Sequence, residues 1–138
     1  MSLSSHRLQR SGTRLTARAL VAAVLCLAVA VIHVIDQGGL KLRDPTYVGV
    51  GYWLLEVTAV ITAILLLIRA TWLTWVLALL VAAGPLVGYI LSRSSGLPGY
   101  TDDIGHWTEP LGVVSLLVEA VLLILAAVAL TRLRRPVS

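Results

Sequence analysis

Four apolar stretches, each about 20 residues long, dominate this chain of 138 residues. A helix of that length rises about 30 Å, which is the thickness of the hydrocarbon layer of a bilayer. The stretches do not alternate with period two, and lipid cannot satisfy unpaired backbone groups, so helices are expected rather than strands. The predicted spans cover residues 17–35, 47–68, 71–91 and 111–130. The sequence therefore predicts an all-α fold, an integral membrane four-helix bundle.

Composition supports this interpretation and indicates one transmembrane domain over residues 1–138. Apolar residues make up 58% of the chain and charged residues only 13%. A soluble domain of this size buries only part of its surface, so this much apolar surface calls for a lipid bilayer as partner. The net charge of +4 does not indicate a nucleic-acid-binding protein, because the basic residues gather at the two chain ends without a stacking aromatic face.

The distribution of Lys and Arg predicts the orientation. Eight of the 11 lie in the two tails and at Arg69, whereas the other two connections hold three. The positive-inside rule then predicts an N-in/C-in protein of the plasma or inner membrane, with residues 1–14 as a basic cytoplasmic tail. Residues 92–110 are expected to form a structured extracytoplasmic loop, because residues 94–99 are rich in turn formers.

The first span admits a second interpretation. A basic start, an apolar stretch and Ala28-Val29-Ala30 also resemble a signal peptide with its cleavage site, although the apolar run is long for one. Cleavage would leave three spans. The single cysteine, Cys26, lies in this span, so no intrachain disulfide forms, and a packing role is expected for its thiol.

Two glutamates lie inside predicted spans, Glu56 in the second and Glu119 in the fourth. Each is about nine residues from the outer end of its span, which places both roughly 13 Å deep. An ionisable side chain at the bilayer centre costs about 3 kcal/mol and normally faces the bundle interior with a partner. Tyr52 and Ser115 lie one turn away on the same helix faces. We expect a buried Glu56/Glu119 pair, which either carries a proton or cation or joins helices by hydrogen bonds.

Imidazole and carboxylate side chains also gather at the outer side of the predicted bundle. They could form a divalent metal site, although no Cys-x-x-Cys or His-x-x-x-His spacing is present. Solvated loop charges are the simpler interpretation, and haem held by His33 and His106 is disfavoured. The candidate metal ligands are His33, Asp36, Asp102, Asp103, His106 and Glu109.

The third span contains Gly84-Pro85-Leu86-Val87-Gly88. Glycines four apart allow two helices to approach closely, and a proline can kink a helix, so packing or a gate is expected here. Aromatic residues at the outer ends of the spans are expected at the membrane–water interface. They are Tyr47, Tyr52, Trp53, Tyr89 and Trp107.

The C-terminal half resembles small uncharacterised four-transmembrane-helix integral membrane proteins of actinobacteria. The residues that carry the resemblance are Gly84-Pro85, Gly88-Tyr89, Ser92-Arg93, Gly96-Leu97-Pro98-Gly99, Glu109-Pro110-Leu111-Gly112 and Glu119. The loop Ser-Arg-x-x-Gly-Leu-Pro-Gly is the most specific part. The resemblance implies a helical bundle in the cell envelope and no particular reaction.

Three classes of function fit these features. The favoured class is a binding or accessory protein, alone, as a homo-oligomer or within a larger membrane complex. Its acidic and histidine-bearing outer site would hold a metal ion, a small ligand or a partner. The second class is a proton- or cation-coupled transporter or channel subunit that uses the Glu56/Glu119 pair. The third is a membrane enzyme that acts on a lipid or isoprenoid.

Overall fold

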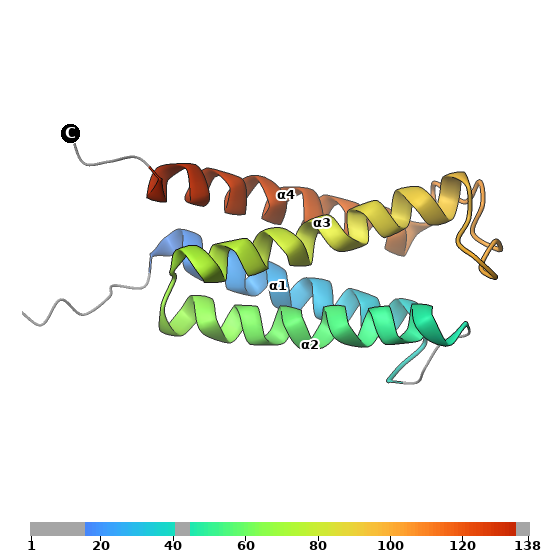
Figure 1. Cartoon of the computed structure of the whole chain (residues 1–138), viewed down its shortest axis with the longest axis horizontal. Helices are drawn as coiled ribbons and strands as arrows, with labels where there is room; N and C mark the ends of the chain where they lie inside the picture. The colour runs from blue at the N-terminus through green and yellow to red at the C-terminus, as the bar shows by residue number, and fades with distance from the viewer. Residues whose placement is uncertain (1–15, 41–44, 135–138) are drawn as a thin grey trace, which may run out of the picture.

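The structure is a bundle of four long helices (Figure 1). It is a computed structural model that describes residues 16–40 and 45–134, so the expected basic tail at residues 1–14 lies outside the described residues. The helices are α1 (Ala17–Asp36), α2 (Thr46–Ile68), α3 (Trp72–Ser94) and α4 (Pro110–Leu133). No strand occurs in the described part of the chain. The predicted all-α four-helix fold is confirmed.

Local signals explain where the helices begin and end. Thr16 caps α1 by accepting a hydrogen bond from the Ala19 amide at 3.2 Å, and Thr71 caps α3 in the same way. Pro110 opens α4, at the position where a missing N–H costs nothing. After α1 the chain turns through Gly38 and Gly39, whose positive φ angles suit glycine alone. Each helix bound lies within three residues of the predicted span.

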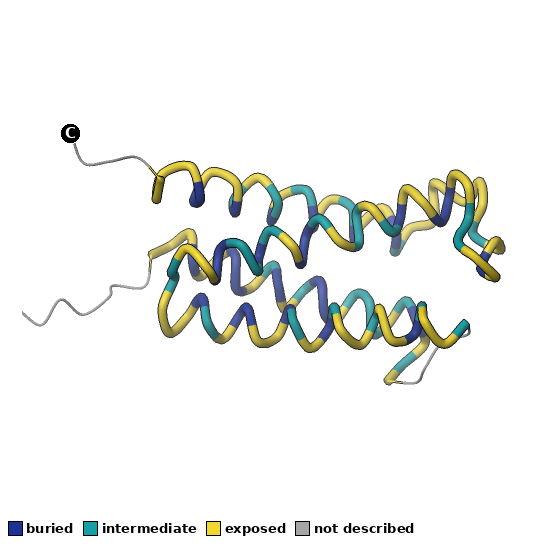
Figure 2. The backbone as a smooth tube through the Cα atoms, viewed as in Figure 1, coloured by how far each residue is buried: buried dark blue, intermediate teal, exposed yellow. Residues whose placement is uncertain are grey.

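The large apolar side chains point outward (Figure 2). In the most apolar 18-residue stretch of each helix, only 28–33% of the residues are buried. Exposed leucines, valines and isoleucines surround the bundle, which on a soluble protein would be an apolar patch of far more than normal size. Each helix is also long and apolar enough to cross a bilayer. The chain is therefore a multi-pass membrane protein.

Small side chains fill the interior between the helices. The buried face of α1 carries Ala19, Ala22, Ala23 and Cys26, all at most 1% exposed. Small residues let membrane helices approach closely, because lipid supplies no hydrophobic force between them. Cys26 is a packing residue in this interface, as expected. The well-packed interior continues through Leu66, Trp75 and Leu122 of the other three helices.

The two ends of the bundle differ in construction. Ala17 and Leu133 lie at one end, with the tight α2–α3 turn, and the longer α1–α2 and α3–α4 connections lie at the opposite end, here called the loop end (Figure 1). From their common turn, α2 and α3 diverge towards the loop end. The helix α3 continues through Pro85 without a break. This divergence leaves space inside the bundle.

Candidate functional site

A cavity of about 360 Å³ lies between the helices at the loop end. Gly51 of α2 and Gly84 of α3 line it and are themselves exposed, so it opens between these two helices. Its volume falls in the range of roughly 300–1,000 Å³ that small-molecule sites occupy. The residues that line it come from all four helices and from the α3–α4 loop. They include Ile32, His33, Asp36, Tyr52, Leu55, Gly88, Arg93, Leu97, Tyr100, Asp103, Leu111, Ser115 and Glu119.

Three glycines keep the cavity open. A Cβ atom added to Gly51, Gly84 or Gly88 would meet no other atom within 4 Å. The expected close helix approach at Gly84 and Gly88 is therefore wrong, since these glycines face space rather than a neighbouring helix. The close approach occurs instead at Gly112 of α4, where an added Cβ would lie 2.7 Å from Cε2 of Tyr89.

All four tyrosines of the chain line the cavity. Each phenol hydroxyl donates a hydrogen bond, which holds the ring in place and leaves its apolar faces as wall. The acceptors are the Pro98 carbonyl for Tyr47 (2.7 Å), Asp36 for Tyr52 (2.7 Å), the Trp107 carbonyl for Tyr89 (2.6 Å) and Asp103 for Tyr100 (2.9 Å). The tyrosines expected at the membrane interface thus contribute to an internal site.

A buried cluster of His33, Ser115 and Glu119 forms one part of the wall. His33 Nε2 lies 3.0 Å from Glu119 Oε1, and the Ser115 hydroxyl donates to the same oxygen at 2.5 Å. Glu119 is only 1% exposed. The Ser115–Glu119 contact follows from their spacing on α4, whereas the partner from α1 could not be predicted. The other imidazole nitrogen, Nδ1, is buried and has no hydrogen-bond partner among the described residues.

Glu56 belongs to a different surface. Its carboxylate accepts a hydrogen bond from the buried Gln37 side chain at 2.7 Å, beside an apolar groove between α1 and α2. Within residues 16–40 and 45–134, no hydrogen bond or ion pair joins Glu56 to Glu119. Tyr52, expected beside Glu56, donates to Asp36. The two glutamates are both buried, as expected, but each has its own partner.

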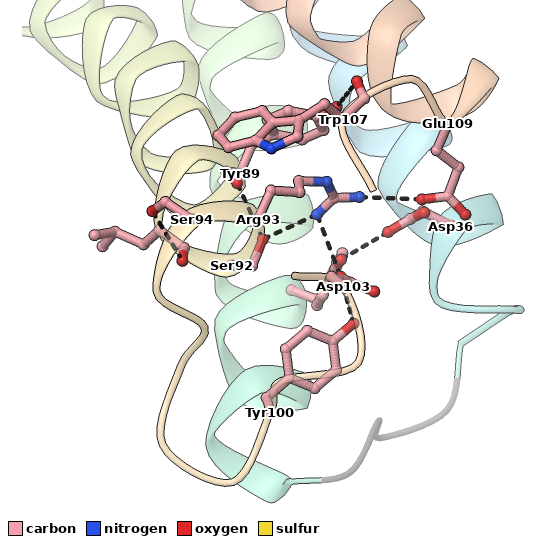
Figure 3. A network of polar contacts seen from close by, with 11 residues as sticks. Asp36, Tyr89, Ser92, Arg93, Ser94, Tyr100, Asp103, Trp107 and Glu109 are labelled. Carbon is pink, nitrogen blue, oxygen red and sulfur yellow. Dashed lines mark hydrogen bonds and ion pairs between the residues drawn. The ribbon is translucent and has the colours of Figure 1, made fainter. Parts of the chain in front are cut away.

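Arg93 organises the wall of the cavity at the α3–α4 loop, through the network of polar contacts in Figure 3. Its guanidinium donates to Asp103 at 3.2 Å and to Glu109 at 3.1 Å, and lies 4.0 Å from the centre of the Tyr89 ring. The Gly105 amide donates to the Arg93 carbonyl, which ties the loop to the end of α3. Arg93 is only 8% exposed. In the sequence, Arg93 is only one of the basic residues in the connections between spans. The acidic residues that follow it are the one sequence signal for its role in holding the loop.

The six candidate metal ligands do not assemble. His33 contacts Glu119, while Asp103 and Glu109 contact Arg93. Asp102 and His106 are exposed on the loop. Among the described residues, which include all six, no group of three or more His, Cys, Asp or Glu side chains is placed to hold a metal ion. The geometry thus gives the predicted metal site no support, because Arg93 already engages Asp103 and Glu109, and Tyr52 donates a hydrogen bond to Asp36.

The arrangement as a whole combines an apolar and aromatic wall with polar side chains: the His33 cluster (His33, Ser115 and Glu119), the Arg93 cluster (Arg93 with Asp103 and Glu109) and Asp36. Such a cavity suits a molecule with an apolar body and one polar end. Comparison of the chain with protein-family models, with curated proteins and with solved structures finds no match. The resemblance to actinobacterial four-span proteins therefore stays a prediction.

Proposed function

We propose that this membrane protein binds a small amphipathic molecule in the cavity at the loop end. The observation that carries the proposal is the preformed space itself, bounded by glycines on two helices and by four anchored tyrosine rings. Protein interiors are otherwise packed like organic crystals, with few voids larger than water. Glycine also costs stability inside a helix, so glycines that face empty space point to a requirement for that space.

The opening between α2 and α3 supports the amphipathic character of the ligand. An apolar body can enter through this side from the surrounding lipid, because the exposed surface beside Gly84 is apolar. A polar end would find charged groups at the His33 cluster, at the Arg93 cluster and at Asp36. This is the binding class that the sequence favoured, with a small ligand in place of a metal ion.

Filling the cavity tests the proposal. Gly88→Leu places a side chain in the space, whereas Val87→Leu adds volume on the neighbouring, 54% exposed position that faces outward. Each variant is placed in nanodiscs and titrated by calorimetry with phenylalkyl alcohols and amines, against empty nanodiscs. We expect saturable binding by wild type and Val87→Leu, and its loss in Gly88→Leu. Equal binding by all three proteins would refute the proposal.

The buried His33–Ser115–Glu119 cluster favours proton-coupled transport as a second candidate function. A chain of titratable and hydroxyl groups at membrane depth is typical of proton relays. On this alternative, uptake of the ligand into proteoliposomes requires a pH gradient and is lost in Glu119→Gln. Binding without uptake under any gradient would leave the first proposal and remove this one.

A further inference from the structure

The charges that line the cavity are not balanced. Arg93 is the only Lys or Arg among the described lining residues, and both Asp103 and Glu109 accept its hydrogen bonds. Its positive charge is thus already met by two carboxylates. A ligand anion placed beside Arg93 would compete with these carboxylates and gain little, because the site around Arg93 is already net negative.

Glu119 is in a different position. Its only ion-pair partner in the described part of the chain is His33, at 3.0 Å. When it holds one proton, the pair is neutral overall, either as a carboxylic acid beside a neutral imidazole or as a carboxylate beside an imidazolium. Both forms hold one proton between the two side chains. An arriving cation can therefore pair with the Glu119 carboxylate if that proton leaves.

We propose that the polar end of the ligand is an ammonium group, which pairs with the Glu119 carboxylate and displaces one proton from the His33–Glu119 pair. The inference rests on the proposed function. One positive charge enters the site and one leaves, so no net charge is added at membrane depth, where an uncompensated charge is expensive. The released proton passes to solvent, and the neutral His33 imidazole keeps a lone pair to accept an N–H donor.

The walls suit a cation with an apolar body. The Arg93 guanidinium already lies over the face of Tyr89 at 4.0 Å, which shows that an aromatic ring of this cavity stacks on a positive charge. Tyr52 lies against the His33 ring with 5.4 Å between ring centres, next to the proposed ammonium site. An alkyl or aryl amine thus meets aromatic faces along its body and a carboxylate at its end.

The proton exchange must be considered with every charged neighbour of Glu119. The titratable and charged groups that line this region or act on the pair come from each packed element. They are His33 and Asp36 on α1, Tyr52 and Glu56 on α2, Tyr89 and Arg93 on α3, Tyr100 and Asp103 on the loop, and Glu109 before α4. The set contains four carboxylates and one guanidinium, that of Arg93, which favours a cation over an anion as the ligand.

Three probes with one body test the inference: 4-phenylbutylamine, 4-phenylbutanol and 4-phenylbutyrate. Calorimetry in nanodiscs between pH 6 and 8 keeps the amine protonated, because amines titrate near pH 10. We expect the amine to bind about tenfold or more tightly than the alcohol, since hydrogen bonds to charged groups are the stronger ones. Release of one proton makes the affinity of the amine rise by up to about tenfold per pH unit.

Glutamine variants provide the matched control. Glu119→Gln should remove the advantage of the amine over the alcohol and the release of the proton, while the alcohol still binds. Glu119→Asp keeps a carboxylate and should restore part of the advantage. Glu56→Gln removes a second buried carboxylate, one that does not line this cavity, and should keep the advantage of the amine over the alcohol. Circular dichroism confirms that each variant is folded before titration.

The outcomes separate the inference from the proposed function. Alcohol binding as tight as amine binding, still abolished by Gly88→Leu, overturns the ammonium inference and keeps the ligand cavity. Tightest binding by 4-phenylbutyrate also overturns it and assigns the polar end to Arg93. Amine binding without proton release overturns the exchange. If Gly88→Leu leaves the binding of all three probes unchanged, or none of them binds, both the inference and the proposed function fail.

Discussion

The same substitution, glycine to alanine, should have opposite effects on stability at two positions of the bundle. At Gly112 an added Cβ would lie 2.7 Å from Cε2 of Tyr89, well inside van der Waals contact. Tyr89 cannot easily move away, because its hydroxyl is bonded to the Trp107 carbonyl and Arg93 covers its ring. Such overpacking costs about 1–3 kcal/mol. We therefore expect Gly112→Ala to be destabilised by that amount.

At Gly88 the expected sign is reversed. An added Cβ meets no other atom within 4 Å, so no contact is strained. Replacing glycine by alanine inside a helix removes backbone freedom from the unfolded chain, which stabilises by about 0.5–1 kcal/mol. Gly88→Ala should therefore be slightly more stable than wild type, even though it narrows the cavity.

Both changes in the free energy of unfolding can be measured by unfolding the protein in mixed micelles with increasing sodium dodecyl sulfate and monitoring the helix content by circular dichroism. A double variant isolates the contact, because Tyr89→Leu removes the ring that the methyl group added by Gly112→Ala would strike. The cost of Gly112→Ala should then largely disappear, and the coupling between the two substitutions should be about 1–3 kcal/mol. A Gly112→Ala protein as stable as wild type would refute the described contact of Gly112 with Tyr89, and a Gly88→Ala protein destabilised by about 1–3 kcal/mol would refute the open space at Gly88.

Two further predictions concern buried side chains. Arg93→Met should destabilise the protein by about 2 kcal/mol in the same unfolding assay, because Asp103 and Glu109 lose their shared partner; their partial exposure keeps the cost moderate. An unchanged unfolding curve would show that the Arg93 cluster does not hold the loop. Cys26, 0% exposed, should resist a maleimide reagent in the folded protein and react once dodecyl sulfate unfolds it, as mass spectrometry can follow. Rapid labelling in mild detergent would contradict the packing described for α1.

Contacts within one helix could be predicted from the sequence, because helix geometry alone determines them. The span boundaries follow from hydropathy, and the approach of Ser115 to Glu119 follows from a spacing of four residues. The burial of Glu56 and Glu119 follows from the cost of placing a carboxylate in lipid. In each case the relevant physical constraint acts locally along the chain.

Contacts between helices could not be predicted in the same way. The equal depth of Glu56 and Glu119 is a consequence of rise per residue, but their pairing also depends on how each helix is rotated about its axis. Packing of small residues decides that rotation. It turns Glu56 towards Gln37 and turns Glu119 towards His33. Depth alone therefore suggested a carboxylate pair where the structure has two separate carboxylate sites.

The cavity escaped prediction because the same residues are compatible with two arrangements. Glycines four apart on a membrane helix usually mark a close contact, and nothing in Gly84 and Gly88 themselves distinguishes contact from space. The distinguishing information lies elsewhere: the tight turn near Arg69 holds α2 and α3 together at one end, and the two helices diverge towards the other. A sequence pattern read one helix at a time does not contain that information.

The orientation of the bundle decides from which side a ligand reaches the cavity, and the positive-inside rule predicts that the loop end is extracytoplasmic. Because Cys26 is buried, single cysteines added at exposed positions can report the topology. Asp102→Cys at the loop end should react in intact cells with a membrane-impermeant maleimide. Arg69→Cys, in the exposed α2–α3 turn, should react only after the membrane is permeabilised; seven other basic residues stay on that side to preserve the orientation. The reverse labelling pattern would place the loop end and its cavity on the cytoplasmic side, and the protein would then bind a molecule from that side.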